Sequence, residues 1–165
     1  MKKDKKRKAD ISAKAKMESL RFQTIWGAKQ KLNELTPEIE TRIDEELRLF
    51  ANLQLIADLL VLKTIIDNIK NKLGINNEPT KGMLAGSMVA FCLGIEPQNP
   101  MSGGQVMDIS DLELPLQLTI SYNNEIRQDV TNWLTANGYN MSTYLGQPLI
   151  KLTNSRIVIR RVVKA

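Results

Sequence analysis

The sequence contains no histidine and only one cysteine, Cys92, among its 165 residues. These absences exclude a disulfide-bonded scaffold, a structural Cys/His zinc site, and catalysis by a Ser-His-Asp or Cys-His nucleophile. Aromatic residues make up only 5% of the chain, which argues against an aromatic platform for stacking bases. No apolar run approaches the roughly 18–20 residues of a membrane span, and no stretch resembles a signal peptide. We therefore expect no membrane association and a reducing, cytoplasmic environment.

Positive charge is concentrated at the two ends of the chain, although the net charge is only +5. Residues 1–16 contribute +6, residues 130–165 contribute +5, and the segment between them is acidic. A basic N-terminal run is typical of a disordered tail that meets a polyanion or an acidic protein, or that serves only solubility. We expect these tail cations to bind nucleic acid or an acidic protein surface: Lys2, Lys3, Lys5, Lys6, Arg7 and Lys8.

Apolar residues at helical spacing predict a first helix over residues 17–35. Its apolar stripe includes Leu20, Phe22 and Trp26.

Two further helices are predicted before the middle of the chain. Thr36 and Pro37 are typical of an N-cap and a first helical position, so a helix begins there. Its pattern breaks near Asn52 and resumes over residues 55–73. Gly74 is then a typical residue to end the helix in the left-handed conformation.

The second half of the chain mixes helix and strand patterns, with alternating apolar residues marking the strands. The whole is expected to be α+β, with a helical N-terminal half and a small β-α-β-β half. We divide it into the tail at 1–16, a helical region at 17–74 and an α+β region at 75–165, with 17–165 forming one compact unit. The expected elements are a helix over 82–93, a strand over 114–121, a helix capped by Asn123 or Asn124, and a hairpin of strands 149–153 and 156–163 turning at Asn154-Ser155.

One segment resembles a known family. Residues 81–100 read KGMLAGSMVAFCLGIEPQNP: a basic residue before glycine, Ala-Gly-Ser, Val-Ala-aromatic, Leu-Gly-Ile, and a later proline. This pattern resembles the palm signature of bacterial C-family replicative DNA polymerases, the polymerase III alpha subunit. With weaker matches in its flanking helices and strand, the resemblance covers residues 38–139.

The resemblance implies a nucleotidyltransferase palm whose Gly-Ser lies near the incoming triphosphate. Here those positions are Gly86 and Ser87, with Lys81 in place of the family's arginine. Backbone N–H groups beside a glycine, together with a hydroxyl, can hold phosphate oxygens. A contact between helices made by small residues, without any ligand, remains the alternative, and composition alone favours it.

The resemblance also implies a loss. The family's metal-binding aspartates fall at Leu116, Leu118 and Ile120 in this chain, and leucine cannot ligate Mg²⁺. Asp111 and Glu113 could face one side of a strand and supply two carboxylates, or they could be solvated residues where a strand begins. We expect no catalytic residue and no cofactor, with Mg²⁺ only if Asp111 and Glu113 prove to be ligands.

The last predicted strands carry cations without acids. Lys151, Arg156 and Arg160, with Arg161 on the other face, could form a cationic sheet face for phosphates or protect an edge strand against aggregation. We expect a non-catalytic, palm-like protein that binds nucleic acid or an acidic partner through its basic ends. The alternatives are an assembly component of a viral particle or another large complex, in contact with other subunits there, and a nucleotidyltransferase or piece of a split polymerase. The cytoplasm or a viral particle is the expected location.

Overall fold

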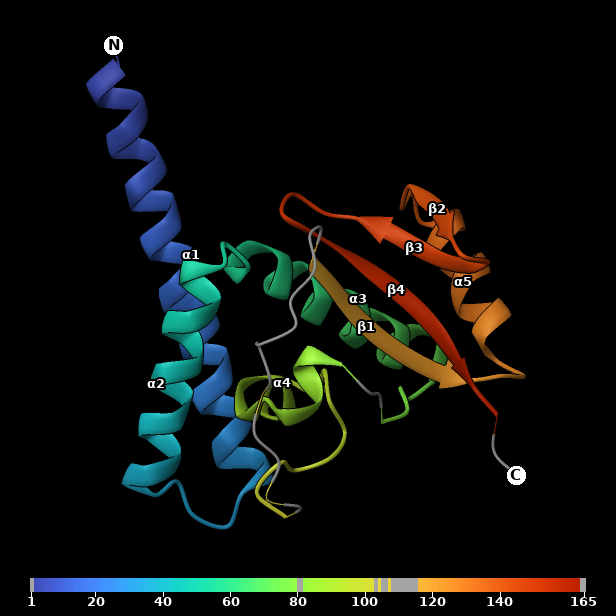
Figure 1. Cartoon of the computed structure of the whole chain (residues 1–165), viewed down its shortest axis with the longest axis horizontal. Helices are drawn as coiled ribbons and strands as arrows, with labels where there is room; N and C mark the ends of the chain where they lie inside the picture. Colours follow the sequence, from blue (N-terminus) through green and yellow to red (C-terminus); the bar gives the residue numbers. More distant parts are fainter. Residues whose placement is uncertain (1, 80–81, 103, 105–106, 108–115, 164–165) are drawn as a thin grey trace.

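The computed structural model describes residues 2–79, 82–102, 104, 107 and 116–163. They form a mixed α+β fold, as predicted, with helices first and a four-stranded sheet in the C-terminal part (Figure 1). The elements are α1 (Lys2–Lys31), α2 (Pro37–Asn52), α3 (Ile56–Leu73), the 3-10 helix η1 (Met83–Gly86), α4 (Met88–Cys92), β1 (Leu116–Asn123), α5 (Arg127–Ala136), β2 (Met141–Tyr144), β3 (Gln147–Lys151) and β4 (Ser155–Val162).

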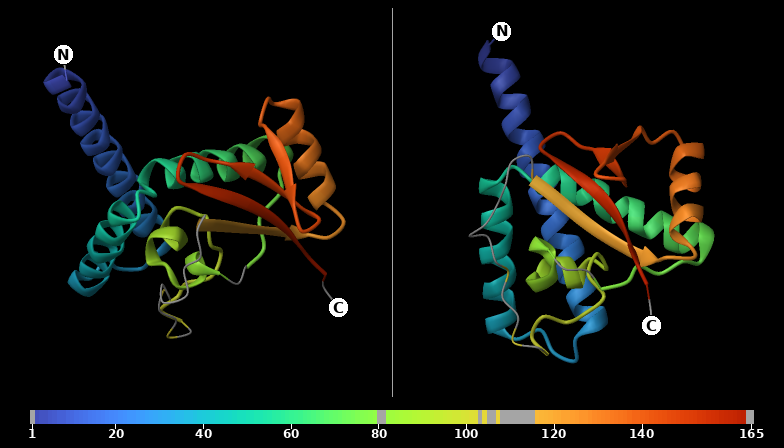
Figure 2. Two further views of the ribbon diagram at one scale, coloured as in Figure 1. Left: turned by 45° about the horizontal axis from the view of Figure 1, so that its top comes forward. Right: turned by 45° about the vertical axis from the view of Figure 1, so that its right-hand side comes forward.

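The helix α1 begins at Lys2, where the sequence analysis expected a disordered tail. Lysine, arginine and alanine are strong helix formers, and the second half of α1, packed on α2, α3 and α4, provides a helix from which the first half continues. The N-terminal half of α1 projects away from the rest of the molecule (Figures 1 and 2). Residues 2–16, which were expected to be disordered, are helical in the structure.

The apolar side chains of α1 are only partly buried. Leu20 is fully buried, but Phe22 and Trp26 are 71% and 60% exposed. At about 100° per residue, Phe22 lies about 200° around the helix from Leu20. The two aromatic side chains therefore lie on the face opposite the core.

The predicted boundaries of α2 and α3 are confirmed. The Thr36 hydroxyl accepts a hydrogen bond from the Ile39 N–H at 3.2 Å, and Pro37 occupies the first turn. The chain turns after Asn52 through Gln54, which has a positive φ of 58°. Gly74 ends α3 in the left-handed conformation, with φ 67°.

The single helix predicted over residues 82–93 is interrupted. Ser87 is extended, with φ −92° and ψ 122°, and separates η1 from α4. Its hydroxyl accepts a hydrogen bond from the Ala90 N–H at 3.0 Å and so caps α4. Serine side chains compete with the backbone in this way, which favours a helix start over a helix interior.

The sheet has the order β1-β4-β3-β2, with β1 and β4 parallel and the other pairs antiparallel. Sequence analysis missed β2, whose residues show no alternation of apolar and polar side chains. It also predicted a cap on α5 that is absent: Ile126 stands at the N-cap, and the Asn123 side chain accepts from the Glu125 N–H. The turn between β3 and β4 is anchored to α3, because Asp58 accepts hydrogen bonds from the Asn154 N–H and the Ser155 hydroxyl.

One face of the sheet builds the core. β1 and β4 pack over α3 and α5 (Figures 1 and 2), and their inward side chains belong to one apolar cluster. Within the described part of the chain, no helix covers the opposite face, where Gln117, Lys151 and Arg160 are exposed.

Among the described residues, no single helix is long and apolar enough to cross a membrane. α2 and α3 satisfy the length and composition criteria only as a pair, and the pair is bent by 111°.

Candidate functional site

The alternating stripe of β1 lies in the core. Leu116, Leu118 and Ile120 are at most 4% exposed, and Leu118 and Ile120 pair with Ile157 and Ile159 of β4. These are the positions at which the resemblance implies metal-binding aspartates. Hydrocarbon side chains fill them, so this face of β1 offers no oxygen ligand at these three positions.

Tyr122 continues the same stripe. Its side chain is fully buried, and its hydroxyl has no hydrogen-bond partner within the described residues. Burial raises the pKa of this hydroxyl well above its ordinary value, because the charged form would lose its hydration. The one polar atom on the stripe is thus held neutral.

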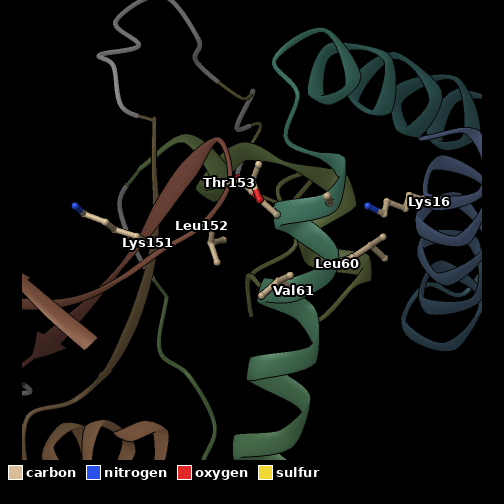
Figure 3. Close-up of a pocket in the computed structure, with 8 residues that line it drawn as sticks. Lys16, Leu60, Val61, Lys151, Leu152 and Thr153 are labelled. Atoms are coloured by element: carbon tan, nitrogen blue, oxygen red, sulfur yellow. The ribbon is translucent and has the colours of Figure 1, made fainter. Parts of the chain in front are cut away.

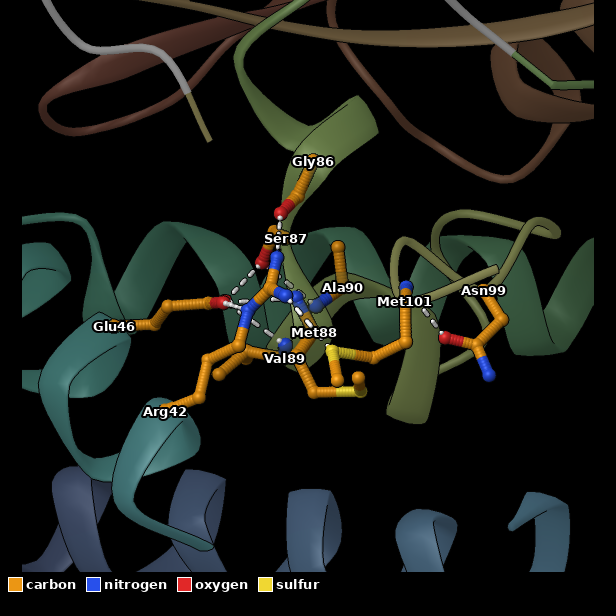
Figure 4. A network of polar contacts seen from close by, with 9 residues as sticks. All are labelled: Arg42, Glu46, Gly86, Ser87, Met88, Val89, Ala90, Asn99 and Met101. Carbon is orange, nitrogen blue, oxygen red and sulfur yellow. Dashed lines mark hydrogen bonds and ion pairs between the residues drawn. The ribbon is translucent and has the colours of Figure 1, made fainter. Parts of the chain in front are cut away.

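The segment predicted to bind phosphate is in contact with a buried carboxylate from another helix (Figure 4). Glu46 of α2 is 7% exposed. It accepts hydrogen bonds from the Ser87 hydroxyl at 2.6 Å and from the N–H groups of Met88 and Val89 at 3.0 Å each. An anion is favoured where the N–H groups of a helix start converge. Glu46 supplies that anion from within the chain.

Arg42 closes the network from the same helix. Its guanidinium lies 3.1 Å from the Glu46 carboxylate and donates to the Gly86 carbonyl at 2.7 Å. We name Arg42, Glu46, Gly86 and Ser87 the buried carboxylate network. A phosphate could reach Gly86 and Ser87 only by displacing Glu46, because Ser87 is fully buried and already bonded.

Sequence reasoning missed Arg42 and Glu46, although one signal was available. Glu46 lies about 60° around α2 from Ile43, at the edge of the apolar stripe, and it is buried together with Ile43 and Leu47. A carboxylate on a buried stripe needs partners, and Arg42 one turn earlier is the first of them.

Three predicted site residues, Lys81, Asp111 and Glu113, lie outside the described residues. Over the described ranges, no group of three His, Cys, Asp or Glu side chains gathers closely enough to hold a metal ion.

The open face of the sheet brings three predicted cations together. Lys151 pairs with Arg156 across β3 and β4, and Arg160 lies four residues further along β4 on the same face. The Arg156 guanidinium stacks over the Tyr144 ring at 4.0 Å. We name Lys151, Arg156 and Arg160 the cationic sheet face; within the described residues, no carboxylate pairs with any of them.

Arg161 points to the other face of β4 and stands apart from this group. Its charge adds to burial in lowering the pKa of Arg127, at the start of α5. The effect of one guanidinium on another indicates that the two cations lie close together.

A hollow of about 620 Å³ is lined by residues of α1, of α3 and of the end of β3 with the turn that follows it. Lys16 points its amino group into this hollow, whereas the amino group of Lys151 points away from it (Figure 3). Leu60, Val61 and Leu152 supply apolar walls. The hollow therefore presents a single amine, and it does not extend the cationic sheet face.

Sequence comparison identifies the scaffold. The profile of the bacterial DNA polymerase III alpha NTPase domain matches residues 18–144. The chain belongs to this family. The match confirms the resemblance and extends it to include half of α1. No curated protein matches the chain significantly.

The limits of the polymerase III alpha match fall at informative places. It includes the buried carboxylate network, the β1 stripe and β2, and it stops before β3 and β4. Residues 2–17 and the cationic sheet face lie outside the matched segment. Both basic ends of the chain are thus separate from the part that defines the family.

Proposed function

We propose that this polymerase III alpha family member binds nucleic acid through its basic ends and does not catalyse nucleotidyl transfer. The observation that carries the proposal is the cationic sheet face. Three long cations share one face of the sheet, Lys151 and Arg160 exposed and Arg156 half-buried, and no described acid pairs with them. Such a surface suits a phosphate backbone, which repeats its negative charge at short intervals.

The chemistry of the individual residues supports phosphate contact. Guanidinium groups present several donors in a plane and bind phosphate oxygens in a bidentate manner. Stacking on Tyr144 holds the Arg156 guanidinium in place, which reduces the rotamer freedom lost on binding. Lys151 and Arg160 are exposed on either side of it.

The absence of catalysis is proposed from the β1 stripe. Two-metal transfer requires carboxylates that hold both ions. Leu118 and Ile120 occupy two of the implied positions and are buried against β4. The buried carboxylate network likewise uses Ser87 for internal bonding, which leaves no free hydroxyl there for a triphosphate.

Fluorescence anisotropy of a labelled 20-nucleotide single strand tests binding. The double variant Lys151→Glu/Arg160→Glu is expected to bind about tenfold more weakly than the wild type at about 0.1 M salt. Lys70→Glu/Lys72→Glu, which makes the same charge change at exposed positions near the end of α3, is the matched control and should lose less than about threefold. Equal losses in both variants, or no binding by the wild type, would overturn the proposal.

Incubation with Mg²⁺, a nucleoside triphosphate and a primed template tests the catalytic half. We expect no incorporation. Incorporation that disappears in Asp111→Asn/Glu113→Gln would establish the nucleotidyltransferase alternative instead.

A further inference from the structure

The strongest unassigned feature is an aromatic pair on the outward face of α1. Phe22 and Trp26 are one helical turn apart and mostly exposed. Large aromatic side chains normally account for much of a core or an interface. Two of them side by side in solvent indicate a surface that is covered in use.

On α1 itself, the exposed face around the aromatic pair carries more positive than negative charge. Lys14 and Lys29 are exposed and lie within about 80° of Phe22 around the helix. Glu18 is the one acid on this face between them. The part of α1 that precedes Met17, residues 2–16 with Lys14 among them, carries a net charge of +6. A polyanion that also carries flat apolar groups could pair with the lysines of α1 and stack on the two aromatic rings.

The low aromatic content of the chain argued against a platform for stacking bases, but two of its few aromatic side chains lie side by side on this exposed face. We propose that the aromatic pair stacks the unpaired bases of a single-stranded nucleic acid, with the lysines of α1 holding its phosphates. This proposal rests on the proposed function and specifies the form of nucleic acid that is bound. Residues one turn apart have Cβ atoms about 5–6 Å apart. That distance approaches two base steps of about 3.4 Å, which gives each ring access to a base. Bases buried inside a duplex cannot stack in this way.

Two other occupants fit the surface less well. A second copy would bring one basic helix α1 against another, and the charges would repel. A membrane surface requires a wide, continuous apolar face. On α1 the polar residues Lys14 and Glu18 separate Ile11 from the aromatic pair.

The test uses the full chain with Trp133→Phe, which leaves Trp26 as the only tryptophan. The probes are unlabelled oligo-dT, oligo-U and a DNA duplex, each of 20 nucleotides per strand. Both single strands are expected to quench the Trp26 fluorescence, and the duplex is expected to leave it nearly unchanged. Phe22→Ala/Trp26→Ala, made in the otherwise wild-type chain, should weaken single-strand binding at least tenfold, as measured by anisotropy, with duplex affinity unchanged.

Ile11→Ala is the matched control, because Ile11 is an exposed apolar residue on the same face but lies outside the aromatic pair. It should leave single-strand affinity unchanged. If Phe22→Ala/Trp26→Ala also leaves it unchanged, the stacking proposal is wrong while nucleic-acid binding by the basic ends stands. If the wild type binds no probe, both proposals are wrong. If the double variant instead dissolves a dimer or abolishes binding to anionic lipid vesicles, without affecting single-strand binding, another occupant covers this face.

Discussion

The hydroxyl of Ser87 donates a 2.6 Å hydrogen bond to the carboxylate of Glu46, and both side chains are buried. Forty-one residues separate them in the sequence. The bond joins α2 to the start of α4 and places an internal anion where the family resemblance implied an external one. Glu46 is therefore a structural residue, because several hydrogen-bond donors would lose their acceptor if its carboxylate were removed.

We predict that Glu46→Ala lowers the free energy of unfolding by about 3–5 kcal/mol. The substitution removes the carboxylate that accepts from the Ser87 hydroxyl, from two backbone N–H groups and from the Nε–H of Arg42. Urea denaturation followed by circular dichroism measures the change. Glu45→Ala, at the exposed neighbouring position, should change it by less than about 0.5 kcal/mol. Equal effects would show that the network contributes little.

The two faces of β1 should differ in how much stability an added carboxylate costs. Leu118→Asp places an unpaired charge in the core and is expected to cost at least about 3 kcal/mol. Gln117→Asp adds the same side chain at the exposed adjacent position and should cost less than about 1 kcal/mol. If Leu118→Asp folded normally and bound Mg²⁺ by isothermal titration calorimetry, the stripe would still be a usable metal site.

Gly27 allows α1 and α4 to approach closely. A Cβ atom there would lie 1.8 Å from the Cys92 carbonyl oxygen, so Gly27→Ala must push the helices apart. We predict a net loss of at least about 2 kcal/mol in unfolding free energy, although alanine favours a helix by about 1 kcal/mol over glycine. Thermal unfolding of this variant and of the exposed substitution Gln30→Ala provides the comparison. A stabilised Gly27→Ala would contradict the helix contact.

The buried thiol of Cys92 predicts a loss of stability in alkali. Burial raises the pKa of Cys92 from 9.0 to about 11, so the unfolded chain ionises first as the pH rises. The stability that the neutral thiol of Cys92 contributes to the folded state is fully present below pH 9. It is lost between pH 9 and 11, by at most about 1.4 kcal/mol per pH unit. Cys92→Ala should therefore lose less stability than the wild type over this range. Lys31, whose pKa burial lowers, has the opposite effect but is present in both chains.

Much of the fold could be predicted because local signals agreed with the final packing. Thr36-Pro37, the break near Asn52 and Gly74 marked helix ends through caps and backbone conformation. Alternation marked β1 for the same reason, since one face of that strand is core. The helical structure of residues 2–16 was not predicted, because the run of cations was taken as a sign of disorder and the helix propensity of lysine and alanine was given less weight.

The errors at the candidate site have a common cause. Periodicity places Phe22 near Trp26 but cannot decide which side of a helix another element will cover. Likewise, nothing local announces that Glu46 will meet Ser87, because their contact depends on how α2 and α4 pack. The cations of β3 and β4 could be predicted to share a face, since their register follows from the hairpin.

The salt dependence of nucleic-acid binding tests most directly whether this polymerase III alpha family member works as a polyanion binder. Affinity for a 20-nucleotide single strand should be measured by anisotropy from about 50 to 300 mM salt, with the full chain and with residues 2–16 deleted. We predict that the logarithm of the association constant falls linearly with the logarithm of salt concentration, with a slope of about −0.7 for each phosphate contact. The deletion should lower the affinity and flatten the slope. An affinity that changes neither with salt nor with the deletion would contradict the proposal.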